Sequence, residues 1–167
     1  MLRRITLLAA VVAVMSVAVA GIAYAAVRTG TDGPDTIRGT LGSDQIFGRG
    51  GNDTLNGRAG DDFISGGRGP DDIFGGPGED ELLGGNGADD IFGGADDDFI
   101  EGNAGADSLF GGDGNDTIDG RDGVAGNDFV SGGEGQDDVC IVDSRDEVGP
   151  GCETVIFDPD NNFPDNI

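Results

Sequence analysis

One aliphatic side chain recurs at every ninth position along most of this chain, always two residues after an aspartate. Ten nine-residue units run without a gap from Gly30 to Asp119, and two more follow residues 120–122 and end at Cys140. Within each unit, position 1 is Gly, position 6 is Asp and position 8 is Ile, Leu or Val, while position 4 is Gly everywhere except at Asp96. Self-similarity at a short fixed period predicts a repeat architecture in which each unit packs only against its neighbours.

Each unit predicts a turn followed by a short strand. Glycines at positions 1, 2 and 4 permit positive φ and close backbone approach, so positions 1–6 are expected to form the turn. In a strand over positions 7–9 the middle side chain points away from its neighbours, so the aliphatic residues from Ile37 to Val139 face inward as a thin apolar core. Burial of one aliphatic side chain contributes about 1.5–3 kcal/mol, whereas ordering one backbone residue costs about 1–2 kcal/mol. One such side chain in nine residues does not offset that cost, and a further stabilising agent is therefore expected.

The units match the pattern G-G-x-G-x-D-x-U-x, where U is a large aliphatic residue. The stretch from Gly30 to Cys140 therefore resembles the hemolysin-type, or RTX, calcium-binding repeat family. The resemblance implies an all-β fold, a parallel β-roll that winds as a right-handed solenoid of about twelve nonapeptide units. Two units make one coil in such a roll, so equivalent residues stack every 18 positions. Asp96 is expected to tolerate the left-handed backbone of position 4, because Asp adopts it more readily than most residues.

Stacking of the coils places the position-6 aspartates in two rows. At a coil spacing of about 4.8 Å, two neighbouring carboxylates repel each other by about 0.9 kcal/mol in water. A divalent cation between successive turns reverses the sign of that interaction. Calcium accepts about six to eight oxygen ligands from carboxylates and carbonyls. Zinc and other transition metals prefer His or Cys, and this chain has no His.

Calcium is therefore the predicted ion, with the position-6 aspartates as its side-chain ligands and turn carbonyls supplying the rest, as the resemblance implies. If each ion lies between turns two units apart, the ten uninterrupted units hold up to about eight ions. The insertion at residues 120–122 breaks the phase before the last two units. Aspartates at positions 5 and 7 are expected to be solvated surface charge. The predicted metal ligands are Asp35, Asp44, Asp53, Asp62, Asp71, Asp80, Asp89, Asp98, Asp107, Asp116, Asp128 and Asp137.

The start of the chain has the pattern of a secretory signal peptide. Two arginines precede an almost unbroken apolar run from Ile5 to Ala20, and Ala23-Tyr24-Ala25 forms a small-x-small cleavage site. Residues 1–25 are therefore predicted to be removed, and the mature protein to be secreted and extracellular. An uncleaved anchor helix is the alternative, because the apolar stretch is just long enough to span a bilayer. Residues 26–29 are expected to be a short linker.

The end of the chain is predicted to close the roll. Cys140 and Cys152 are the only cysteines, and in an exported chain such a pair indicates a disulfide rather than two free thiols. We expect residues 30–140 to form the roll and residues 141–167 to form a disulfide-closed cap and a polar tail. Within the cap, the strand-like stretch from Thr154 to Phe157 is expected to cover the last coil, because terminal repeats need such a cover.

Composition excludes several classes of function. Without His, a Ser–His or Cys–His nucleophile cannot be built, and without Lys no lysine-based chemistry is available, so we expect no enzyme. Beyond residue 25 the chain carries seven arginines against 33 carboxylates, a net charge of −26. Such a surface repels nucleic acid and anionic membranes, and neither is an expected partner once the signal peptide is removed.

Three phenylalanines form the one extended apolar feature expected on the outside. Phe74, Phe92 and Phe110 share position 9 and lie 18 residues apart, with Asn56 and Arg38 continuing the line. They form either an aromatic ladder that stiffens the sheet or a docking face for a glycan or a protein on a cell surface. Two hypotheses follow. The chain is a secreted calcium-binding protein that folds on calcium, or a calcium-stabilised surface or adhesive protein.

Overall fold

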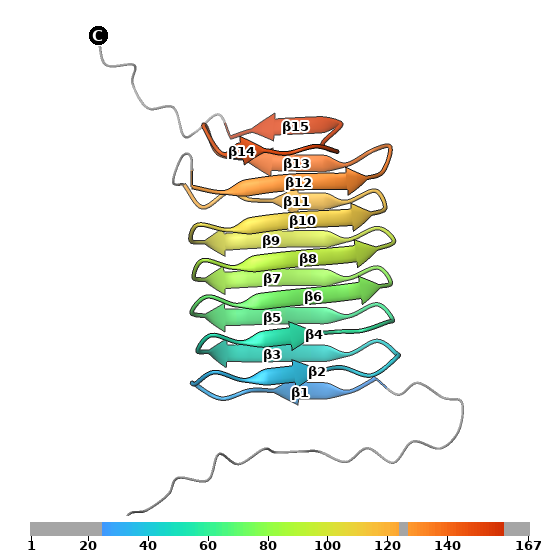
Figure 1. Cartoon of the computed structure of the whole chain (residues 1–167), viewed down its shortest axis with the longest axis vertical. Coiled ribbons are helices and arrows are strands. Elements are labelled where there is room, and N and C mark those ends of the chain that lie inside the picture. The colour runs from blue at the N-terminus through green and yellow to red at the C-terminus, as the bar shows by residue number, and fades with distance from the viewer. Residues whose placement is uncertain (1–24, 124–126, 159–167) are drawn as a thin grey trace, which may run out of the picture.

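The computed structural model describes residues 25–123 and 127–158, and the turn and strand predicted for each unit recur along the repeat (Figure 1). The fold is an all-β parallel β-roll, as predicted. In chain order the strands are β1 (Val27–Thr29), β2 (Thr36–Arg38), β3 (Gln45–Gly50), β4 (Thr54–Asn56), β5 (Phe63–Arg68), β6 (Asp72–Pro77), β7 (Glu81–Asn86), β8 (Asp90–Ala95), β9 (Phe99–Ala104), β10 (Ser108–Asp113), β11 (Thr117–Asp119), β12 (Phe129–Glu134), β13 (Val139–Val142), β14 (Glu147–Val148) and β15 (Thr154–Phe157).

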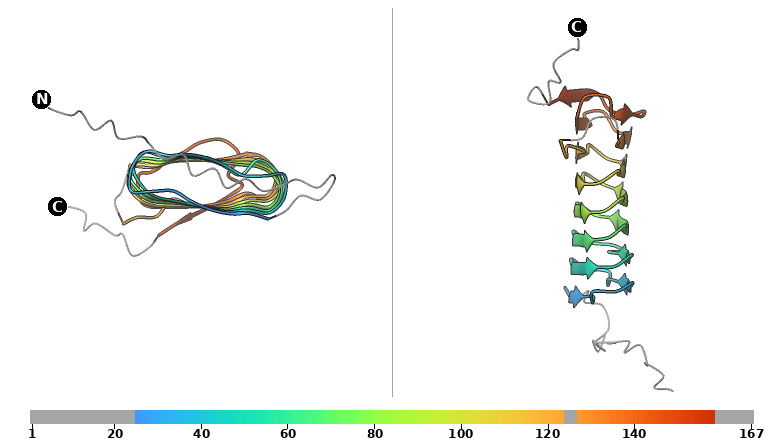
Figure 2. Two further views of the ribbon diagram at one scale, coloured as in Figure 1. Left: turned by 90° about the horizontal axis from the view of Figure 1, so that it is seen from below. Right: turned by 90° about the vertical axis from the view of Figure 1, so that its left-hand side faces the viewer.

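Alternate strands belong to opposite walls of the roll. The odd-numbered strands β1 to β15 form an eight-stranded sheet, and the even-numbered strands β2 to β14 form a seven-stranded sheet. Every pair is parallel, and paired residues lie 18 apart along the regular part of the chain, as for Ile46 with Ile64 and Ile73 with Ile91. Two units therefore make one coil. Seen end-on, the coils superpose as a flattened ring with one sheet on each long side (Figure 2).

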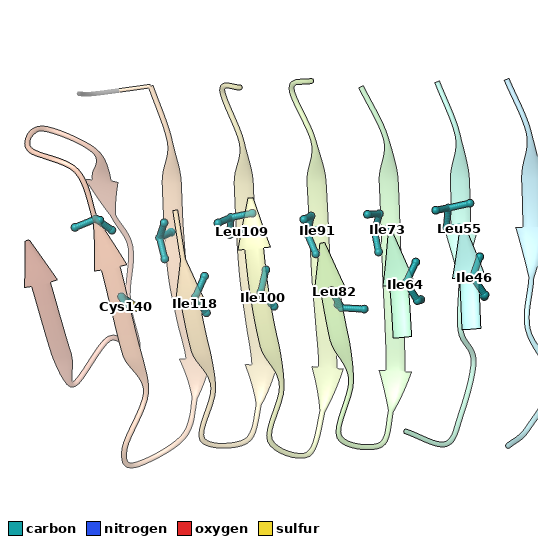
Figure 3. Packing of buried hydrophobic residues seen from close by; sticks show 12 residues of the cluster. Ile46, Leu55, Ile64, Ile73, Leu82, Ile91, Ile100, Leu109, Ile118 and Cys140 are labelled. Atoms are coloured by element: carbon teal, nitrogen blue, oxygen red, sulfur yellow. The ribbon is translucent and has the colours of Figure 1, made fainter. Parts of the chain in front are cut away.

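The core is a single line of side chains from each sheet, meeting between the two walls (Figure 3). From Ile46 to Val130 its members are the position-8 residues expected from the pattern, and Ile37 packs against them from the first coil while only partly buried. The fully buried residues are Ile46, Leu55, Ile64, Ile73, Leu82, Ile91, Ile100, Leu109, Ile118, Val130, Cys140 and Val142.

Most strands are longer than the three residues expected. In the middle of the roll they run for six residues, from position 7 through position 3 of the next unit. Because side chains alternate along a strand, position 1 then faces inward together with position 8. Ile73 and Gly75 of β6 are both buried in this way. The glycine of position 1 is therefore an interior residue as well as a turn residue.

Residues 26–29, expected to be a linker, extend the roll instead. Val27–Thr29 forms β1 and pairs in parallel with β3. The pairing satisfies backbone groups along the edge of β3 that would otherwise be left open at the end of the sheet.

The last repeat unit adopts a different phase from the one predicted. Cys140, and not Val139, pairs with Ile118 and continues the buried line (Figure 3). The predicted disulfide explains the choice, because it joins Cys140 to Cys152 across a Cα–Cα distance of 5.7 Å at the end of the core. With Val139 inside, alternation would turn the Cys140 side chain outward, away from this position.

The stretch from Thr154 to Phe157, which was expected to cover the last coil, forms β15 and pairs with β13 at the end of the sheet.

Neither stretch that the structure describes contains a helix long and apolar enough to cross a membrane. The predicted signal peptide, up to residue 24, and the polar tail from residue 159 lie outside the described residues.

Candidate metal centres

The position-6 aspartates lie directly before the strands and form two rows along the roll. Row A precedes strands of the eight-stranded sheet, and row B precedes strands of the seven-stranded sheet. The aspartates of both rows are buried, and the most exposed of these buried residues, Asp98, is only 4% exposed. Asp35, at the end of the roll, is the exception and is partly buried. Row A contains Asp44, Asp62, Asp80, Asp98, Asp116 and Asp138; row B contains Asp35, Asp53, Asp71, Asp89, Asp107 and Asp128.

Each row is held together by one repeated hydrogen bond. The backbone N–H of an aspartate donates to Oδ1 of the aspartate one coil further on, as from Asp71 to Asp89 at 2.9 Å. Ten such bonds link successive members of the two rows, at 2.6 to 2.9 Å. They fix the orientation of every carboxylate and occupy one of its two oxygens.

The other oxygen of these carboxylates is buried and has no hydrogen-bond partner among the described residues. Buried polar atoms in proteins nearly always have a partner, and leaving a carboxylate oxygen without one is costly. Ten repetitions of the same unpartnered atom indicate a missing ligand of one kind. The atoms are Oδ2 of Asp53, Asp62, Asp71, Asp80, Asp89, Asp98, Asp107, Asp116, Asp128 and Asp138.

A backbone carbonyl faces the same space as each of these oxygens along most of the roll. A Cβ atom built on Gly84 would lie 2.5 Å from Asp89 Oδ2 and 2.7 Å from the carbonyl oxygen of Gly102. The same relation holds at the position-1 glycines of the earlier units. Beside each position-1 glycine there is thus a small niche, lined by oxygen atoms, that a methyl group would fill. A hard cation such as calcium is the ligand that an all-oxygen donor set suits.

Burial makes the full negative charge of the rows unfavourable in the ion-free chain. Burial, as the largest cause, raises the pKa of Asp62 to about 6, of Asp80 to about 7 and of Asp98 to about 8. The charge of the preceding row member raises each pKa further, while its backbone hydrogen bond lowers it. A cation beside these oxygens would offset the cost of burying their negative charge.

Side chains alone do not complete a metal site. Within residues 25–123 and 127–158, no three His, Cys, Asp or Glu side chains form a group that could hold a metal ion. Carbonyl oxygens such as that of Gly102 are therefore required, as the resemblance implied.

The family comparison gives the same result as the geometry. The RTX calcium-binding nonapeptide repeat (4 copies) matches residues 29–64, 58–91, 65–100, 92–124 and 122–140, more than half of the chain. The chain belongs to this RTX family. It is thus a calcium-binding β-roll protein. No curated protein matches it.

The first aspartate of each row differs from the other members. Asp35 Oδ2 accepts a hydrogen bond from the Thr31 N–H at 2.6 Å, and Asp44 Oδ2 accepts one from the Thr40 N–H. Both aspartates were predicted as ligands, but their second oxygens already have a partner within their own turn.

The structure places Asp128 in row B and excludes Asp137 from row A. The insertion is absorbed in the turn between β11 and Asp128, and the Asp107 N–H still reaches Asp128 Oδ1 at 2.8 Å. Asp137 is exposed, and its neighbour Asp138 accepts the N–H of Asp116 at 2.8 Å instead. Asp137, which was predicted as a metal ligand, therefore lies outside row A, and Asp138 takes its place in the row. The turn before β13 is one residue longer than the others, and the nine-residue count alone does not show this.

The aromatic line predicted on the outer face is a stacked ladder. Phe74 and Phe92 lie 5.2 Å apart and Phe92 and Phe110 lie 5.0 Å apart, with ring planes within 5° of parallel. Asn56 and Arg38 continue the line in the sheet register, as expected. The rings cover one another's faces, so the flat surfaces that would stack on a sugar are already in use.

Proposed function

We propose that calcium ions bind between successive coils of both RTX rows, and that this binding folds the chain after export. The observation that carries the proposal is the set of ten buried Oδ2 atoms without a partner. Their side chains are held in place by the N–H ladder, so the folded roll presents these oxygens in one repeated orientation. The ten uninterrupted units provide four gaps in each row, hence up to about eight ions, and Asp128 and Asp138 add a fifth gap to each row.

The side-chain ligands in this proposal are the row members inside the repeat, with Asp138 in place of Asp137. Each contributes Oδ2 to a niche beside a position-1 glycine, where carbonyl oxygens complete the donor set. Calcium supplies the positive charge that lets neighbouring carboxylates coexist at the spacing of one coil. Asp35 and Asp44 would exchange a local N–H for the ion, so we expect the first gap of each row to bind most weakly.

Folding is proposed to depend on the ions because the apolar core is thin. Each coil buries two aliphatic side chains, and two rows of like charge oppose the stacking. A ligand that binds only the folded state stabilises it by mass action. Extracellular calcium modules bind with Kd of about 10⁻⁴ to 10⁻³ M, a range that keeps the chain unfolded at low cytosolic calcium. The signal-peptide pattern and the disulfide support folding outside the cell.

A calcium titration followed by far-UV circular dichroism tests this proposal. We expect a cooperative change from coil to β-structure at about millimolar calcium, reversal on adding a chelator, and no equivalent response to magnesium. Asp89→Asn should raise the midpoint about threefold or more, because it removes the charge of a niche oxygen. Asp90→Asn is the matched control, since Asp90 is the next residue and is exposed. A chain equally rich in β-structure in the chelator would disprove coupled folding.

Docking to a cell-surface glycan or protein through the Phe74, Phe92 and Phe110 face is the alternative role. It has less support than ion-coupled folding, because the ring faces are stacked on one another. The absence of His and Lys from the sequence makes catalysis the least supported role.

A further inference from the structure

Row A continues beyond the last nonapeptide unit, into the C-terminal cap. The Asp138 N–H donates to Oε2 of Glu153 at 3.1 Å, which repeats the bond between row members. Glu153 lies directly before β15, just as each repeat aspartate lies directly before its strand. The segment around Glu153 does not follow the nonapeptide pattern, and the family match ends at residue 140.

The oxygen niche of the row also continues into the cap. Asp138 is fully buried, and its Oδ2 has no hydrogen-bond partner in the part of the chain that the structure describes. A Cβ atom built on Gly132 would lie 2.6 Å from Asp138 Oδ2 and closer still to the carbonyl oxygen of Gly151. Gly151 of the cap thus takes the place that the position-1 glycine of the next coil has elsewhere, as Gly102 has beside Gly84.

Row B has no such niche at its corresponding end. The insertion lies here, and the three atoms nearest to a Cβ atom on Gly120 belong to the side chains of Val130, Leu109 and Asp128, so no oxygen atom is among them. Asp146 does accept the Asp128 N–H, but only at 3.5 Å. The C-terminal ends of the two rows therefore differ. Row A is the one whose end repeats the oxygen donors of a repeat site, a carboxylate and a glycine carbonyl.

The disulfide holds this junction together. Cys140 follows Asp138 by two residues and Cys152 directly precedes Glu153, so the bond fixes the two acidic residues next to each other. β15 lies at the same end of the roll as β13 (Figure 1). The two strands pair with Val139 opposite Thr154, which places Asp138 and Glu153 in the same register. The cap thus presents its oxygens from a covalently fixed position.

We propose that the junction between the last coil and the cap is a further calcium site, built by Asp138, the Gly151 carbonyl and Glu153. The inference rests on the proposed function of the rows and extends it to residues outside the nonapeptide pattern. An ion here neutralises the last buried carboxylate of row A and fastens β15 to the end of the roll.

The number of bound calcium ions and the protection of β15 test this site. The secreted protein and its Glu153→Gln variant are saturated with calcium, and bound ions are counted by equilibrium dialysis. Gln keeps the acceptor for the Asp138 N–H but loses the charge, so we expect one ion fewer and at least about tenfold faster hydrogen exchange in β15. Glu147→Gln is the control, because Glu147 is an exposed glutamate of the cap that lies outside row A. It should change neither quantity.

The outcomes separate this inference from the proposed function. A wild-type protein that binds no calcium would overturn both. A wild-type protein that binds calcium, with an unchanged ion number in Glu153→Gln, would overturn the cap site alone. Faster exchange without loss of an ion would also overturn it, because Glu153 would then stabilise β15 without binding calcium. Asp138→Asn provides a second variant, which should also lose one ion, whereas its neighbour variant Asp137→Asn should not.

Discussion

At the scale of single residues, the glycines at positions 1 and 2 of the repeat unit have different roles. In the third to tenth units position 2 takes a left-handed backbone, and Arg49 and Arg58 occupy it at φ of 82° and 92°. This strain costs about 1–2 kcal/mol and is tolerated, so position 2 varies. Position 1 has no such substitutions, because a side chain there would enter the oxygen niche beside Asp89 and its equivalents. Asp96 at position 4 adopts φ of 79°, the left-handed backbone expected of it.

Gly84→Ala should therefore damage the roll through its ion site and not through backbone strain. The new methyl group would lie against Asp89 Oδ2 and the Gly102 carbonyl, and we expect at least one ion fewer and a calcium midpoint raised about tenfold. Gly33→Ala is the control, since a Cβ at Gly33 meets no atom within 4 Å. Calcium titration by circular dichroism measures both. Equal midpoints for the two variants would argue against the niche.

At the scale of elements, β6, β8 and β10 are joined by more than their backbone ladder. Each carries one phenylalanine of the stacked series at the same register position. Adjacent aromatic rings contribute about 0.5–1.5 kcal/mol per pair beyond the area they bury. Phe92 lies in the middle and stacks on both neighbours while 38% exposed.

Phe92→Ser should thus lower the free energy of unfolding in saturating calcium by about 1–3 kcal/mol more than a matched change elsewhere. Phe99 is the matched residue, because it is also 38% exposed, lies on the opposite sheet and stacks on no ring among the described residues. Thermal or denaturant unfolding of Phe92→Ser and Phe99→Ser gives the comparison. If Phe92→Ser instead left stability unchanged and abolished binding to a surface glycan or protein, the docking role would be favoured.

At the scale of the whole molecule, two buried rows of carboxylates dominate the energetics of the ion-free chain. The net charge of −24 leaves few cations to neutralise them, and the Arg121 guanidinium pairs with Asp119, outside the rows. Burial accordingly raises the pKa of the row carboxyls and so favours their protonated form. The effect is clearest at Asp98, whose pKa is raised to about 8. Protons and calcium ions can thus each neutralise the buried carboxylates of the rows, and either allows the coils to stack.

The ion-free roll should consequently gain stability in acid. The pKa of Asp71 is about 6 and that of Asp89 about 7 in the folded chain, against about 3.9 for an unfolded aspartate. Because the folded state holds more protons, this contribution is fully present below about pH 4 and is lost as the pH rises through the folded values. We expect ion-depleted protein to gain β-structure, by circular dichroism, between about pH 8 and about pH 5. Calcium-saturated protein should change little over this range, and loss of β-structure by the depleted protein would contradict the expectation.

Much of the architecture could be predicted from the sequence because its determinants are local and periodic. Nine residues per unit, with the two units per coil that the family resemblance implied, place Asp71 beside Asp89 and Phe74 beside Phe92 without knowledge of any distant contact. Alternation along each strand then decides which side chain of a unit faces inward. The period also predicted a divalent cation, because stacked carboxylates repel one another unless their charge is neutralised.

Where the period ends, tertiary contacts decided the structure. Asp137 and Asp138 are chemically identical in the sequence, and the choice between them follows from the disulfide of Cys140 and its pairing opposite Ile118. Glu153 joins row A because β15 pairs with β13, a contact that no local sequence pattern predicts. The repeat sequence by itself therefore determined the rows and the core, through the alternation and spacing of a regular chain. Only the folded chain decided how those rows end, because strand pairing and a covalent bond between distant residues set the register there.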